Sequence, residues 1–290
     1  MSDATSAARE DPLLAHAPPE RVNYATGVLL DAQDFRDEQT YHRGRLARAL
    51  SALVGFGTIA GLRVLPPEAD DPELELHVEP GLALDRHGRL IEIQVPWCIR
   101  LARWFAAATT PDLVAALHRA PRGVPPAAVV VDVFLSATDC ARAKTPAFAS
   151  GPFAALDALV PARLAETPVL ELVPRVEGGP GPIPTPRNFW PAPAASAEDR
   201  LIAVLGSFEL PNAEGTLDPL REHVVGHDPS AVLLARAAIP VTLAEDAPAG
   251  TRPTLDLTQR VSVDNGLRPF IFLPGKWLGR AFDAAPLVQP

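Results

Sequence analysis

Apolar and polar residues between positions 31 and 54 follow the three-to-four-residue spacing of an amphipathic helix. The resulting stripe consists of Phe35, Gln39, His42, Leu46, Leu50 and Leu53. Asp31 is a good N-cap, and Asp34 occupies the third helical position, where a carboxylate stabilises the helix start. The pattern predicts a long N-terminal amphipathic helix over residues 31–54. We expect its stripe to pack on a sheet, so that Leu46→Asp would unfold the domain.

After the helix the hydrophobic period changes to two, which indicates β-strands. In the first predicted strand, 55–64, the glycines at 55, 57 and 61 let another backbone or a packed helix approach closely. Asp85 to Gly88 predicts a turn that joins two strands into a hairpin. The apolar run at 129–135 predicts a central strand covered on both faces. Further strands are expected at 74–78, 82–84, 90–95, 169–176, 201–210, 237–243 and 254–257, and short helices at 111–119, 152–159 and 277–282.

These elements predict an α+β, β-rich fold of antiparallel sheets or a sandwich, with one long N-terminal amphipathic helix and short helices. Residues 1–22 are expected to form a flexible arm, and residues 23–176 an N-terminal β-rich domain. The Pro- and Gly-rich segment 177–196 is either a linker or an exposed loop. Residues 197–290 form a C-terminal β-rich part, which can complete the same domain. The stretch 136–163 is expected to be irregular apart from its short helix.

Composition narrows the class of protein. The chain has 290 residues, long enough to bury a substantial core, and 47% of them are hydrophobic. Its 33 prolines and 19 glycines favour short elements joined by stiff loops. The net charge of −9 argues against nucleic-acid binding, which needs a basic face.

Cys98 and Cys140 lack the spacing of a disulfide framework. We expect two reduced, mostly buried thiols, with a single disulfide as the alternative. No apolar stretch reaches the length of a membrane span, and the N-terminus lacks the pattern of a signal peptide. The expected place of synthesis and folding is therefore the cytoplasm.

Candidate catalytic and metal-binding residues are few. His223 and His227 are four residues apart, beside Glu222 and Asp228, a spacing that can place two imidazoles on one helical face. The nearby Gly226 and Pro229 disfavour a helix, so an exposed loop is the preferred interpretation. Nucleotide-binding and hydrolase fingerprints are missing from the sequence. We predict no catalytic, metal-binding or cofactor-binding residues.

Aromatic residues offer a different kind of candidate site. Phe189 and Trp190 lie inside the proline-rich segment and are the aromatic residues most expected at the surface. Such side chains anchor protein interfaces and also stack on sugars. By contrast, Trp97 and Trp104 follow strand and helix patterns and are expected in the core.

Three blocks at 23–41, 55–64 and 78–93 follow one another in a characteristic order. The residues that define them are Asp31, Asp34, Phe35, Gly55, Gly57, Gly61, Pro80, Gly81, Asp85 and Gly88. In this order the chain resembles structural proteins encoded with contractile phage-tail-like injection systems, and the N-terminal regions of phage baseplate and tail-fibre proteins. The resemblance covers about a quarter of the chain closely. Stretches 130–137, 201–210 and 263–272 are similar in placement to later family segments.

The resemblance implies a non-enzymatic structural subunit associated with a baseplate or fibre. The implied partners are baseplate, tube, sheath or fibre components, with the chain as a homo-oligomer, a trimer or at a six-fold position. We expect Tyr24, Phe189, Trp190 and Arg268 to lie at interfaces. Assembly is expected in the cytoplasm, in a particle that is then released or docked at a membrane. One alternative is a carbohydrate- or receptor-binding module of a tail fibre, and a weaker one is a particle-borne cell-envelope hydrolase.

Overall fold

The computed structural model describes residues 11–14, 20–68, 71, 73–118, 127–146, 159–175, 196, 217–224, 226–244 and 247–271. Its helical elements are η1 (Pro12–Leu14), α1 (Ala32–Val54), α2 (Leu101–Ala107) and α3 (Thr110–Ala115). Its strands are β1 (Gly57–Gly61), β2 (Val64–Leu65), β3 (Glu75–Val78), β4 (Gly81–Leu84), β5 (Leu90–Ile93), β6 (Trp97–Arg100), β7 (Leu117–His118), β8 (Ala128–Pro146), β9 (Leu159–Pro174), β10 (Val232–Thr242), β11 (Thr254–Leu255) and β12 (Ser262–Asp264).

The strands form three antiparallel sheets, so the predicted β-rich, antiparallel class is confirmed. The largest sheet has the order β11-β10-β8-β7, with β12 also paired to β10 and β9 to β8. Two smaller sheets have the orders β1-β4-β5 and β2-β3-β6. Because β10 pairs directly with β8, the C-terminal part shares a sheet with the N-terminal part.

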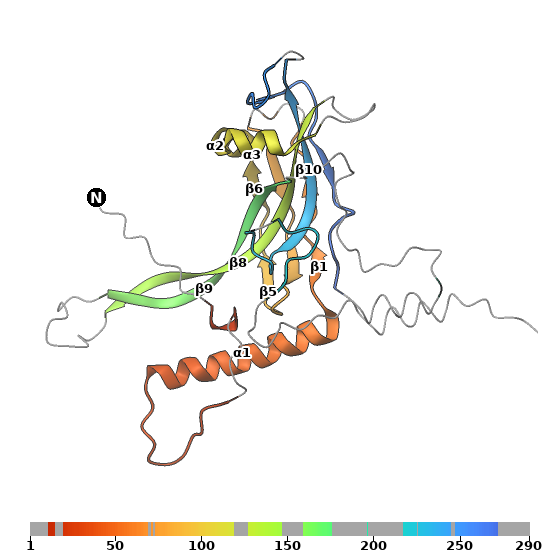
Figure 1. Ribbon diagram of the computed structural model, residues 1–290. Coiled ribbons are helices and arrows are strands. Elements are labelled where there is room, and N and C mark those ends of the chain that lie inside the picture. Colours follow the sequence, from red (N-terminus) through yellow and green to blue (C-terminus); the bar gives the residue numbers. More distant parts are fainter. Residues whose placement is uncertain are drawn as a thin grey trace, which may run out of the picture.

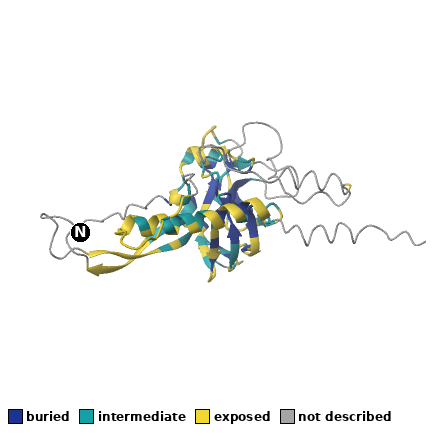
Figure 2. Cartoon of the chain, turned by 90° about the horizontal axis from the view of Figure 1, so that it is seen from below, coloured by how far each residue is buried: buried dark blue, intermediate teal, exposed yellow. Residues whose placement is uncertain are grey.

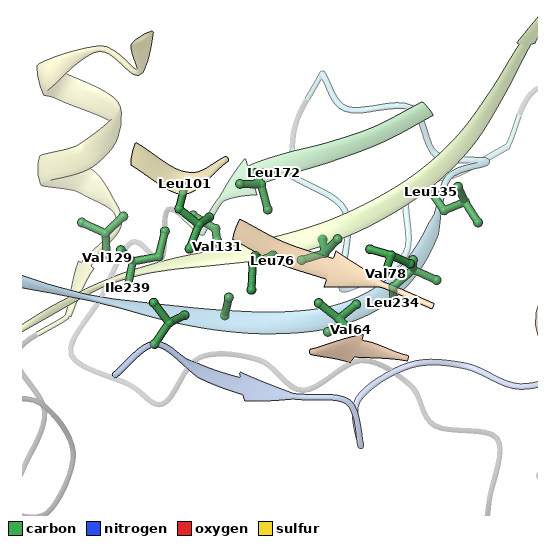
Figure 3. Packing of buried hydrophobic residues seen from close by; sticks show 14 of the residues in the cluster. Val64, Leu76, Val78, Leu101, Val129, Val131, Leu135, Leu172, Leu234 and Ile239 are labelled. Carbon is green, nitrogen blue, oxygen red and sulfur yellow. The ribbon is translucent and has the colours of Figure 1, made fainter. Parts of the chain in front are cut away.

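The main core lies between the large sheet and the small β2-β3-β6 sheet (Figure 3). Val64, Leu76 and Val78 from the small sheet are fully buried there. On the large sheet, Val131 and Leu234 pack into the same cluster. The predicted central strand at 129–135 therefore lies in β8, whose first eight residues are all buried.

Helix α1 lies along one end of the body (Figure 1). Asp31 is its N-cap and accepts hydrogen bonds from the backbone N–H groups of Gln33 and Asp34. In return, the carboxylate of Asp34 accepts the backbone N–H of Asp31 at 2.8 Å. This reciprocal capping box satisfies backbone donors that a helix start leaves open, which explains why the helix begins there.

The face of α1 that contacts the body is not the predicted apolar stripe. Ala47 and Ser51 are the buried residues of the helix, whereas Phe35, Leu46 and Leu53 are 52%, 62% and 64% exposed. A Cβ atom added to Gly88 would lie 1.9 Å from the carbonyl oxygen of Ala47, so the turn and the helix are in close backbone contact. Only small residues fit in such a contact. The prediction that the stripe packs on the sheet is therefore wrong.

Two strand predictions are also corrected. The strand expected over 55–64 divides into β1 and β2, because the chain turns at Leu62, whose φ is 57°. The stretch 136–163 was expected to be irregular apart from a short helix, but residues 136–146 and 159–163 form strands. Here β8 and β9 continue as a two-stranded ribbon beyond the body (Figure 1).

Several predictions fall wholly or almost wholly outside the described residues. They are the segment 177–196 with Phe189 and Trp190, the strand at 201–210, the helices at 152–159 and 277–282, and most of the arm. Both cysteines are free thiols, and Cys98 on β6 is exposed, contrary to the expected burial. In the part of the chain that the structure describes, no helix combines the length and apolar character needed to cross a membrane.

Candidate functional site

The second and third sequence blocks pair in one sheet and contact helix α1, which begins in the first block. Strand β1 pairs with β4, and the turn that follows β4 supports α1 through the Gly88 contact. On the other edge of β1, the backbone N–H of Thr58 donates to the carbonyl of Pro269 at 2.8 Å. This sheet therefore holds α1 in a defined position on the body.

Ion pairs fix α1 further. Arg43 contacts the carboxylates of Asp11 at 3.4 Å and Glu166 at 3.0 Å. Asp11 also contacts Arg89, at 3.4 Å, and Arg89 is held by Asp85 at 2.6 Å. Since Glu166 belongs to β9 and Arg89 follows the β4–β5 turn, these contacts connect α1 to both the ribbon and the body.

Most of the large hydrophobic side chains that are exposed lie on α1, on its lead-in and on the ribbon. Exposed hydrophobic residues of the lead-in and α1 are Tyr24, Val28, Leu29, Leu30, Phe35, Leu46 and Leu53, and those of β9 are Leu159, Val160, Leu164 and Val169. Figure 2 shows exposed residues along α1 and the ribbon, next to buried strands of the body. Large apolar side chains gathered on exposed elements mark interaction sites in soluble proteins when they form a patch.

Among the residues predicted at interfaces, Tyr24 lies on this surface. Its hydroxyl donates to Glu38 of α1, and that hydrogen bond raises the pKa of Tyr24. Arg268 lies elsewhere, at β1, where its guanidinium donates to the carbonyl of Gly61 at 2.9 Å and stacks over Phe270. Burial lowers the pKa of Arg268. The structure thus places Tyr24 and Arg268 on different elements.

The His223–His227 pair is buried, so the exposed-loop interpretation is wrong. His223 packs on the ring of Phe134, and His227 lies 4.4 Å from the same ring. The Nδ1 atom of His223 accepts the Leu220 N–H, and its Nε2 contacts the carbonyl oxygen of Ala231 at 3.1 Å. Burial lowers the pKa of His223 to about 4. Both nitrogens of His223 have backbone partners, as in a structural histidine.

A buried ion cluster crosses the large sheet close to these histidines. Asp132 on β8 is fully buried and accepts two hydrogen bonds from Arg236 on β10, at 2.7 and 3.0 Å. Arg175, just after β9, lies 3.3 Å from the same carboxylate and donates to the carbonyl of Glu222 at 2.7 Å. The carboxylate of Asp132 thus lies between two guanidinium groups, and the cluster connects β8, β10 and the residue that follows β9. Within the described residues, no group of three or more potential ligands could hold a metal ion.

No known protein family matches this chain, and no curated protein matches it. Among solved structures the chain is similar to one titled "Crystal structure of TssK", at 14% identity over 56% of this chain, with a TM-score of 0.27. The match spans 36% of the length of that TssK chain. A similarity this low supports no conclusion about fold or function.

The candidate site is therefore the exposed apolar surface of α1, its lead-in and the ribbon. The sequence pattern predicted the helix and its stripe, but the stripe was expected in the interior. No strand was predicted over residues 136–146 and 159–163, where β8 and β9 form the outer part of the ribbon. One available signal was residue size. Gly44, Ala47 and Ser51, on the face opposite the stripe, are small, whereas the stripe carries Phe35, Leu46 and Leu53.

Proposed function

We propose that this chain is a non-enzymatic structural subunit of a contractile phage-tail-like particle, associated with its baseplate or fibres. The order of the blocks at 23–41, 55–64 and 78–93 supports the class of particle. The structure of α1 supports a role in protein contact. This helix is capped and held by ion pairs, yet it presents large apolar residues to solvent. Exposing apolar area costs solubility unless a partner covers it.

The polar clusters are consistent with this role. Asp132 and His223 are saturated by partners within the fold, as residues that stabilise a scaffold are. We propose baseplate, tube, sheath or fibre components as partners, assembly in the cytoplasm, and a homo-oligomer or a symmetric position in the particle. The carbohydrate-binding alternative depends on Phe189 and Trp190, which lie outside the described residues, so it stays a prediction.

Co-expression with the sheath, tube and baseplate genes of its own locus tests the proposal. We expect the chain to be present in purified particles, and particles made without its gene to lack a complete baseplate or their fibres by electron microscopy. Absence of the chain from particles, together with no binding to any particle component, would contradict the proposed class.

A further inference from the structure

The outer face of α1 has the spacing of a coiled-coil seam. The exposed positions are Phe35, Gln39, His42, Leu46, Ala49 and Leu53, separated by four, three, four, three and four residues. This is the heptad repeat by which α-helices pack side by side in left-handed coiled coils. We call these six residues the α1 seam.

The seam points away from the body. Ala47 and Ser51 are buried on the opposite face of the helix, and Gly44 lies there against Leu13. Seen from below, α1 lies across the body with many of its residues exposed (Figure 2). Another helix can therefore lie along the seam without displacing the contacts of Gly44, Ala47 and Ser51 on the opposite face.

Charges beside the seam favour a second copy of the same helix in parallel orientation. In a parallel pair, a residue preceding the seam on one helix faces the residue five positions later on the other. Glu38 then faces Arg43 of the second copy. The two side chains of this pair carry opposite charges. Arg43 keeps 36% of its side chain exposed although it also contacts Asp11 and Glu166.

An antiparallel pair would be disfavoured by the same residues. With Phe35 opposite Leu53, the centre of the pair would bring Arg43 beside Arg43 and Arg45 beside Arg45. Like charges at such positions repel and select against that arrangement. The charge pattern is therefore self-complementary in the parallel orientation alone.

We propose that the α1 seam binds a second copy of itself, in parallel and in register, so that copies of this chain assemble around a short coiled coil. The inference deepens the homo-oligomer part of the proposed function and rests on it. Its tests use the isolated protein, so their failure leaves membership of a particle open.

Polar seam residues fit this arrangement. Gln39 and His42 occupy consecutive layers, between Phe35 on one side and Leu46 on the other. Polar side chains in a coiled-coil seam lower its stability but fix its register and the number of strands, because a shifted register would bury them against apolar partners. The seam thus combines apolar ends with a register-setting centre.

Sedimentation equilibrium of the full chain tests self-association. Wild-type protein is expected at two or three times the monomer mass of 30.8 kDa. The double variant Leu46→Glu/Leu53→Glu should raise the dissociation constant by at least about tenfold, because it removes apolar burial and opposes like charges. Leu257→Glu is the matched control, since Leu257 is 64% exposed, as is Leu53, but lies beyond β11.

Single-cysteine cross-linking tests the orientation, in a Cys98→Ser/Cys140→Ser background. Leu53→Cys should form a disulfide between copies on mild oxidation, because identical seam positions meet in a parallel pair. In an antiparallel pair the two Leu53 positions would be about 27 Å apart along the axis. The antiparallel orientation is tested by mixing Phe35→Cys chains with Leu53→Cys chains. A disulfide between the two kinds of chain would indicate an antiparallel pair.

Three results would overturn the proposal. The first is that the wild-type protein stays monomeric at all concentrations up to those of the cross-linking experiment. A monomer that binds a particle component through the seam counts as this result too. The second is an oligomer that the Leu46→Glu/Leu53→Glu variant leaves intact. The third is cross-linking between positions 35 and 53 with none between two copies of position 53.

Discussion

The large sheet and helix α1 use their apolar residues in opposite ways. In the sheet, Val131, Leu135 and Ile239 are fully buried, and even the charged Asp132 is enclosed with its partners. In α1, the buried residues are Ala47 and Ser51, while Leu46 and Leu53 face solvent. The apolar residues of the sheet are covered within the chain, whereas the large apolar residues of the helix are not.

This difference separates the requirements of folding from those of assembly. The core between the sheets supplies the apolar burial that stabilises the fold. Helix α1 is attached through a close backbone contact and ion pairs, so its large side chains add little to that burial. Substitutions should therefore affect stability strongly in the sheet and weakly on the α1 seam, whereas their effect on assembly should be reversed.

The largest expected effect is on the sheet. Asp132→Ala would leave Arg236 and Arg175 buried without their carboxylate, which we expect to lower the free energy of unfolding by about 3–5 kcal/mol. Urea denaturation measures this loss. Asp139→Ala, on the same strand but outside the cluster, is the control, and an equal effect of both changes would contradict the role of the cluster.

A pH effect of about 3 kcal/mol is expected from His223. Burial lowers its pKa from 6.5 to about 4 in the folded state, so the unfolded chain binds the proton first as pH falls. The contribution of this group is fully present above pH 6.5 and is lost as pH falls through about 4. Comparing urea denaturation of wild type and His223→Gln between pH 7 and 4 isolates it. Parallel pH profiles would show that His223 titrates normally.

The contact between α1 and the β4–β5 turn should give an intermediate effect. Gly88→Ala and Gly27→Ala both place a side chain at positive φ, 82° and 89°, but only at Gly88 would the new Cβ meet backbone of α1. We expect Gly88→Ala to be less stable than Gly27→Ala by about 1–3 kcal/mol. Equal melting temperatures for the two variants would mean that α1 does not rest on this turn.

Leu46→Asp should have the smallest effect on stability. With 62% of Leu46 exposed, the substitution is expected to change the free energy of unfolding by less than about 0.5 kcal/mol. The measurement uses dilute, monomeric protein, so that dissociation does not contribute. A loss of several kcal/mol in the free energy of unfolding would mean that the stripe packs inside the fold.

The sequence was informative wherever the cause of structure is local. Asp31, Asp34 and the apolar spacing predicted α1 because capping and helical periodicity depend on residues within a few positions of each other. Periodicity reveals that a helix has an apolar face, but not what covers it. That depends on Gly88, far along the chain, whose close contact with Ala47 turns the seam outward.

Features fixed by distant partners were missed for the same reason. Residues 141–146 and 159–164 lack alternation and contain prolines, yet they pair along a ribbon whose solvated faces impose no pattern. Gly226 and Pro229 correctly indicated the absence of a helix around His227. They carried no information about burial, which Phe134 of β8 provides.

Thiol labelling of Leu46→Cys, in a Cys98→Ser/Cys140→Ser background, tests most directly whether the α1 seam is free in the fold and covered in the assembly. We expect labelling at the rate of an exposed thiol in dilute protein, and strong protection at concentrations where the chain self-associates. Slow labelling at every dilution would mean that the stripe is buried within the chain. Rapid labelling at every concentration would mean that no second copy covers it.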